Sequence, residues 1–203
     1  MRELLFGDVP LAQWAGSSTA EPWTSFGRAV AALARQDAAG ARQALKDVLA
    51  QPELEPRHYL EAWEGLRGLD VLPPAAEAKE VYGVVLDVSL DEGVDTLAAY
   101  ADRTARYINY SGNIIVWDHP NFSLDRFTDA LLDAGRALVT KIGPYEHARP
   151  PLPAGATRIS LLTPGGIHFG QAPFDVLAQD PLGSGVITSG AALMEQLINT
   201  GGG

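Results

Sequence analysis

The chain has 203 residues, of which 46% are hydrophobic and 20% are charged, values typical of one folded domain or two small ones rather than of a disordered chain. Its net charge of -10, with 15 Lys and Arg that form no basic run, argues against nucleic acids and anionic membrane surfaces as partners. The lack of cysteine excludes disulfides, thiolate nucleophiles and cysteine-bound metals. Because the sequence also shows no signal-peptide core and no apolar run of membrane-spanning length, we expect an acidic, cytoplasmic protein.

Residues 1–72 are predicted to form a helical region after a turn-rich start. The first helix is expected to begin at Ser25, because serine is a good N-cap residue. The second is expected to begin near Asp37, for the same reason. The third has Pro56 in its first turn, where a missing backbone N–H costs nothing.

Pro73-Pro74 ends this region, because the residue before a proline is pushed out of the helical conformation. Short β-prone segments joined by turns follow. They predict an antiparallel meander with strands at 81–90, 94–101, 104–110 and 114–117. Asp102-Arg103 and Gly112-Asn113 are predicted to be two-residue hairpin turns, since Asp, Asn and Gly tolerate the backbone angles that such turns need.

Ser123 is then predicted to cap a long amphipathic helix that ends at Gly143-Pro144. A second hairpin is expected at 157–169, and a last helix at 185–200. The predicted fold is therefore α+β, with a bundle of about three short helices on or beside an antiparallel sheet domain of order ββββ-α-ββ-α. The expected domains are 1–72 and 80–200, followed by a flexible tail at 201–203.

Two-residue turns would fix the register of the meander, with Tyr100 opposite Ala105 and Tyr107 opposite Asp118. Because side chains alternate along a strand, one face would then hold the candidate binding residues Tyr100, Tyr107, Asn109 and Asp118. An aromatic, polar face with little charge suits a protein partner or a flat ligand. A half-solvated face, or one covered by the N-terminal helices, remains the alternative.

The four histidines are scattered, and no spacing between them places two metal ligands on one element. We therefore expect no metal site, and no sequence motif indicates a cofactor. His119, His147 and His168 define an alternative pocket, where the meander meets the Pro-rich loop at 143–157, if the fold brings them together with Tyr107, Asn109 and Asp118.

Three functions remain open on this basis. The first is a non-enzymatic protein-interaction or scaffold module that uses a sheet face and the helical N-terminal region, with a protein partner or self-association through a sheet edge. The second is a small-ligand binder. The third is an enzyme of unknown class with a His/Asp site near the meander and the Pro-rich loop.

Overall fold

The computed structural model describes residues 2–13 and 18–201. Six strands form one antiparallel sheet in the order β4-β3-β2-β1-β5-β6. The strands are β1 (Gly83–Leu90), β2 (Gly93–Tyr100), β3 (Ala105–Ile108), β4 (Ile114–Trp117), β5 (Thr157–Thr163) and β6 (Gly166–Ala172). The α+β class and the order of the elements are as the sequence predicts, with one additional short helix, α5 (Phe174–Gln179), before the last helix.

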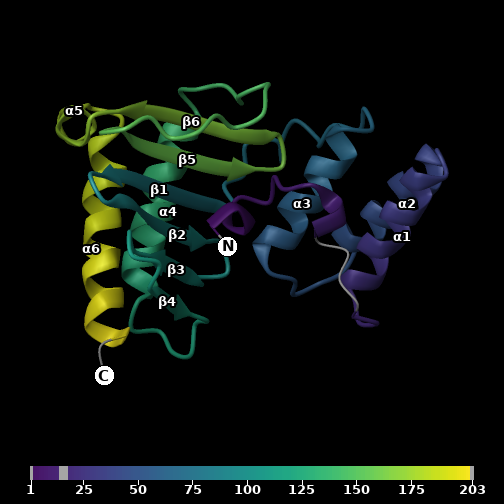
Figure 1. Cartoon of the computed structure of the whole chain (residues 1–203), viewed down its shortest axis with the longest axis horizontal. Coiled ribbons are helices and arrows are strands. Elements are labelled where there is room, and N and C mark those ends of the chain that lie inside the picture. Colours follow the sequence, from purple (N-terminus) through teal and green to yellow (C-terminus); the bar gives the residue numbers. More distant parts are fainter. Residues whose placement is uncertain (1, 14–17, 202–203) are drawn as a thin grey trace.

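Two helices cover one face of the sheet, namely α4 (Asp125–Val139) and α6 (Ser184–Gly201), which run across the strands on the same side (Figure 1). They bury Leu131 and Leu193 against alternate residues of the strands, such as Val84 and Leu161. The sequence places the start of α4 one residue too early, because Leu124 rather than Ser123 occupies the N-cap position. Gly201 ends α6, and the rest of the predicted tail, 202–203, lies outside the described residues.

The N-terminal segment covers the other face of the sheet. Leu5, in the 3-10 helix η1 (Arg2–Leu5), and Phe6 pack on Val85, Ala98 and other side chains that point away from α4 and α6. Leu60 joins the same cluster from helix α3. This part of the sheet is therefore buried on both sides.

Helices α1 (Trp23–Ala34), α2 (Ala38–Leu49) and α3 (Pro56–Arg67) form a core of their own. Asp37 caps α2 by accepting a hydrogen bond of 2.8 Å from the backbone N–H of Gly40, and Pro56 opens α3, as predicted. Helix α1 begins at Trp23, so the prediction of Ser25 as its N-cap is wrong. Only α3 of the three lies next to the sheet (Figure 1). Whether residues 1–72 and 80–200 fold as separate domains stays a prediction.

Candidate functional site

The register of the meander differs from the predicted one. Tyr107 pairs with Leu97 and with Ile115, not with Ala98 and Asp118. Tyr100 pairs with Thr104 instead of the expected Ala105, because its backbone N–H donates a hydrogen bond to the carbonyl of Thr104. The register is shifted by one residue between β2 and β3 and by three residues between β3 and β4. A shift by an odd number of residues moves a side chain to the opposite face of a sheet. The prediction that the four residues share one face is therefore wrong.

The lengths and positions of the turns explain these shifts. The first loop has one residue more than predicted, and the second begins two residues before Gly112 and ends before Asn113. Both hairpins have three-residue loops, 101–103 and 110–112, whose last residue takes a left-handed conformation: Arg103 has φ 65° and Gly112 has φ 89°. Three-residue loops of this kind commonly combine a type I turn with a left-handed third residue. The Asp102 carboxylate stabilises the first loop by accepting bonds from both the N–H and the hydroxyl of Thr104. The sequence shows good turn residues but does not show which of them sits in the left-handed position.

The four candidate residues thus lie in different surroundings. Tyr100 is 1% exposed beneath the N-terminal segment, whereas Tyr107 packs with the α4 and α6 core. Burial, followed by a hydrogen bond to Asp95, raises the pKa of Tyr107 to about 12, so this hydroxyl is a donor at neutral pH. Asn109 shapes the second hairpin by accepting bonds from Ser111 and Asn113. Asp118 is exposed and pairs with Arg106 at 2.6 Å. No ligand role for these residues is tested by the structure.

The structure does not bring His119, His147 and His168 together. His119 faces a shallow depression next to the 101–103 turn. His147 lines a different cleft, and His168 is buried on β6 with its Nδ1 3.1 Å from the carbonyl oxygen of Ile142. The three histidines therefore lie in three separate places and do not form the predicted pocket.

β4 is the strand at one end of the sheet, and the loop that leads from it to α4 passes its outer side (Figure 1) without a backbone hydrogen bond to it among the described residues. Asn109 donates to the carbonyl of Asn113, which makes these two residues a hydrogen-bonded pair of the β3–β4 ladder. In an antiparallel ladder such pairs alternate with non-bonded ones, so Ile115 faces β3 while the N–H and C=O groups of Ile114 and Val116 point outward. Within the part of the chain that the structure describes, no strand pairs with this edge.

Apolar side chains accompany these outward-pointing groups. Ile114 is 40% exposed and Val116 is 52% exposed. Their side chains lie on the same face of the sheet as the N-terminal segment, but that segment packs on side chains of the other strands, such as Val85 and Ala98. Tyr110 precedes them in the hairpin and Phe122 follows them, and both are exposed. We call the outer edge of β4 with the side chains of Ile114 and Val116 the β4 edge surface. A β-branched run in the last strand of a meander was the sequence signal for it.

The opposite edge of the sheet is covered. The segment before β5 runs along the outer side of β6 (Figure 1), and Tyr145 donates a backbone bond of 2.8 Å to the carbonyl of Ile167. Arg158, which is 1% exposed, holds this segment by donating to the carbonyl oxygens of Pro150 and Pro151, while Gln171 of β6 accepts from the same guanidinium. The outer edge of β6 is therefore bonded to another segment of the chain, whereas the outer edge of β4 is not.

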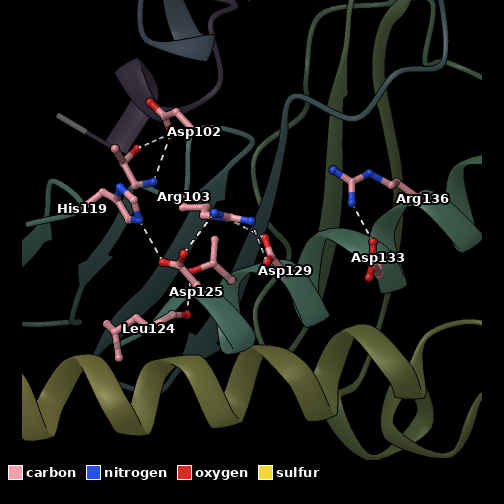
Figure 2. Close-up of polar contacts among 10 residues, drawn as sticks. Asp102, Arg103, His119, Leu124, Asp125, Asp129, Asp133 and Arg136 are labelled. Carbon is pink, nitrogen blue, oxygen red and sulfur yellow. Dashed lines mark hydrogen bonds and ion pairs between the residues drawn. The ribbon is translucent and has the colours of Figure 1, made fainter. Parts of the chain in front are cut away.

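A network of charged groups fixes the end of β4, and Figure 2 shows its side chains turned toward one another. Asp125, in the first turn of α4, accepts from His119 at 2.9 Å and pairs with Arg103 at 3.0 Å. Arg103 also makes a two-pronged contact with Asp129, with both distances 3.1 Å. We call Arg103, His119, Asp125 and Asp129 the polar cluster. It ties the β2–β3 turn and the end of β4 to α4.

The chemistry of the polar cluster is consistent with a positioning role. His119, like Arg103, has a left-handed backbone, with φ 52°, and such conformations persist in non-glycine residues only where the surroundings hold them. A hydrogen-bonded His–Asp pair can act as a general base. However, the ring of His119 makes no hydrogen bond to a serine, threonine or other nucleophile among the described residues. The signal that sequence reasoning missed here was the i, i+4 spacing of Asp125 and Asp129 on one helix face.

A cleft of about 720 Å³ lies between the N-terminal segment, α3 and the β5–β6 hairpin. Tyr145 and Phe169 contribute aromatic rings whose centroids are 4.8 Å apart. Arg149 lines the cleft but is already paired, because its guanidinium contacts Asp8 at 2.9 Å and Glu3 at 2.5 Å. The volume is in the usual range of small-molecule sites.

No group of three or more His, Asp and Glu side chains in 2–13 and 18–201 is arranged to hold a metal ion. None of the helices within those ranges has both the length and the apolar character needed to cross a bilayer. No protein-family model, no curated protein and no solved structure matches this chain.

Proposed function

We propose that this chain is a non-enzymatic protein-interaction module that binds an extended segment of polypeptide along the β4 edge surface. The single observation that supports it is the contrast between the sheet edges: the outer side of β6 is covered, while β4 offers outward-pointing backbone groups beside two exposed β-branched side chains. Addition of a strand to such an edge is a common mode of peptide recognition, with backbone bonds giving affinity and alternate side chains giving specificity.

The surroundings of the edge support this proposal. Arg106 donates to the carbonyl oxygens of Ala105 and Trp117 and pairs with Asp118, and the polar cluster holds the residues that follow. The edge is therefore fixed before a partner arrives, which lowers the entropy cost of binding. Relative to the sequence-based hypothesis, the interaction surface moves from the sheet face, where Tyr100 is buried, to the sheet edge. A cytoplasmic location is part of the same proposal.

The test is selection of short extended peptides that bind the purified full chain, followed by measurement of their affinity for variants. Val116→Pro removes one outward N–H that the β3–β4 ladder does not use, and proline is tolerated on edge strands for this reason. We expect this variant to keep the fold, seen by circular dichroism, and to lose at least about tenfold in affinity. Leu72→Lys is the matched control, because Leu72 is exposed but lies away from the sheet edge. Selected peptides that bind Val116→Pro as tightly as the wild type would rule out the edge.

The cleft supports a second candidate, a small-ligand binding function. Its volume of about 720 Å³ and the neighbouring rings of Tyr145 and Phe169, which are tilted by 59° to each other, favour a compact ligand with an aromatic or flat part. Thermal unfolding of the chain in the presence of pools of metabolites tests it, since a ligand that binds only the folded state raises the Tm. The expected rise should disappear in Phe169→Ala; a rise that persists there would mean that the ligand binds elsewhere.

A further inference from the structure

We infer that the segment bound at the β4 edge surface is β4 of a second copy of this chain, so that two sheets join into one continuous antiparallel sheet. This inference rests on the proposed function, because it names the partner of that same edge. Two copies related by a two-fold axis present the same strand to each other in opposite directions, and each must therefore be complementary to itself.

The hydrogen-bonding pattern of β4 limits the possible registers. Outward-pointing backbone groups belong to Ile114 and Val116, so a two-fold pairing has to place such residues opposite one another. When the axis passes next to Ile115, Ile114 of each copy lies opposite Val116 of the other, and the two pairs exchange four backbone hydrogen bonds. Axes at Ile114 or Val116 would instead place one of the apolar residues opposite Gly112 or Asp118.

The side chains favour the register centred on Ile115. The pairs formed by Ile114 and Val116 bring together the two exposed β-branched side chains, and cross-strand pairs of this type stabilise sheets. Asp118 would lie opposite Gly112, so no like charges face each other across the axis. Its carboxylate is also already paired with Arg106 of the same chain, at 2.6 Å.

The composition of β4 supports a covered edge in the functional protein. Strands that stay at a free edge are usually very short or carry lysine, proline or a bulge, which limit pairing with another chain, and of these features β4 has only the short length. The four residues of β4 are Ile, Ile, Val and Trp, and their pairing with β3 is regular, without a bulge. A short edge contributes few contacts by itself, and the exposed rings of Tyr110 and Phe122 lie before and after it in the chain to extend the buried area.

The oligomeric state of the purified full chain is the first test, measured by light scattering after gel filtration over a range of concentrations. We expect a dimer, and we expect Val116→Lys to raise its dissociation constant by at least about tenfold, because each dimer contains the change twice. Leu72→Lys introduces the same charge at an exposed site away from the edge and should leave the dimer intact. A monomer at every concentration, or a dimer that Val116→Lys does not weaken, would overturn the inference.

The register has its own test, because the chain contains no cysteine and one introduced thiol is therefore unique. At the axis the two Cα atoms of a non-bonded pair are about 4.5 Å apart, within the range of a disulfide. Ile115→Cys should thus form an interchain disulfide under mild oxidation faster than Val116→Cys, with Leu72→Cys giving the rate of random collisions. Faster cross-linking through Val116→Cys would contradict the register.

These outcomes separate the two proposals. A monomeric chain that still selects peptides sensitive to Val116→Pro would exclude the second copy while leaving the edge as the interaction site. Peptide binding that ignores Val116→Pro, together with a monomeric chain, would exclude both.

Discussion

The hydroxyl of Tyr100 donates a hydrogen bond of 2.7 Å to the carbonyl oxygen of Leu5, a residue 95 positions earlier in the chain. The bond is buried, and burial raises the pKa of Tyr100, so the hydroxyl remains a donor throughout the physiological range. It fastens the N-terminal segment to the sheet and explains why this tyrosine is unable to serve as part of a binding surface.

Replacement of Tyr100 by Phe should lower the free energy of unfolding by about 1–3 kcal/mol, because the buried carbonyl of Leu5 then lacks its donor. Urea unfolding measures the change. Tyr145→Phe serves as the control, since Tyr145 is exposed and its substitution should alter stability by less than about 0.5 kcal/mol. Equal effects of the two variants would show that the Tyr100–Leu5 bond does not fasten the segment.

Gly135 lets α4 approach the sheet closely. A Cβ atom at this position would lie 2.6 Å from Cγ2 of Val84, which is fully buried on β1. Gly135→Ala should therefore cost about 1–3 kcal/mol from overpacking, although alanine is the better helix former.

The matched control is Gly27→Ala in α1, where a Cβ atom would meet no atom within 4 Å. Here only the gain in helix propensity remains, and we expect stabilisation by about 0.5–1 kcal/mol. Thermal or urea unfolding of both variants checks the pair. A stabilising Gly135→Ala would mean that α4 can move away from the sheet without loss.

Because of His168, we expect the free energy of unfolding to fall in mild acid. Burial lowers the pKa of His168, only partly offset by its bond to the carbonyl of Ile142. With Nδ1 donating to that oxygen, the proton has to be added at Nε2, a buried atom that has no hydrogen-bond partner. The folded pKa therefore lies below the unfolded value of about 6.5, and the unfolded chain takes up the proton more readily.

This contribution to stability is complete above the unfolded pKa and falls as the pH drops below about 6.5, by at most about 1.4 kcal/mol per pH unit. Urea unfolding between neutral pH and mild acid measures it. His168→Gln should flatten the dependence, leaving the part due to His58, whose pKa burial also lowers. His147→Gln, at an exposed position, should keep the wild-type slope. An unchanged slope in His168→Gln would refute the assignment.

Arg158 is expected to stabilise the segment that covers the outer edge of β6. A lysine can replace its charge but not its planar fork, which contacts two backbone carbonyls and the Gln171 side chain. Arg158→Lys should cost about 2–3 kcal/mol and speed hydrogen exchange at the amide of Tyr145, which bonds to β6. Arg28→Lys is the control, because the Arg28–Asp47 pair is solvent-exposed and exposed ion pairs contribute little to stability. Unchanged hydrogen exchange at Tyr145 would show that Arg158 does not hold this segment against the outer edge of β6.

Local sequence signals determined most of the elements. The fold class, the four strands of the meander, the long helix α4 and the Asp37 and Pro56 helix starts follow from periodicity, caps and proline positions, which act within a few residues. The helix starts predicted at Ser25 and Ser123 were wrong, because Pro22 and Leu124 occupy the N-cap positions.

The tertiary structure decided the features on which the function depends. The sequence indicated turns at 102–103 and 112–113, but not the lengths or positions of the loops at 101–103 and 110–112. The one added residue in the first loop moved Tyr107 to the face opposite Tyr100. Strand order left β4 with a free edge, and contacts between residues as distant as Leu5 and Tyr100 decided which face is covered. Which strands pair and which face of the sheet is covered depend on contacts between residues far apart in the chain. The free energies of these contacts cannot be read from the local sequence.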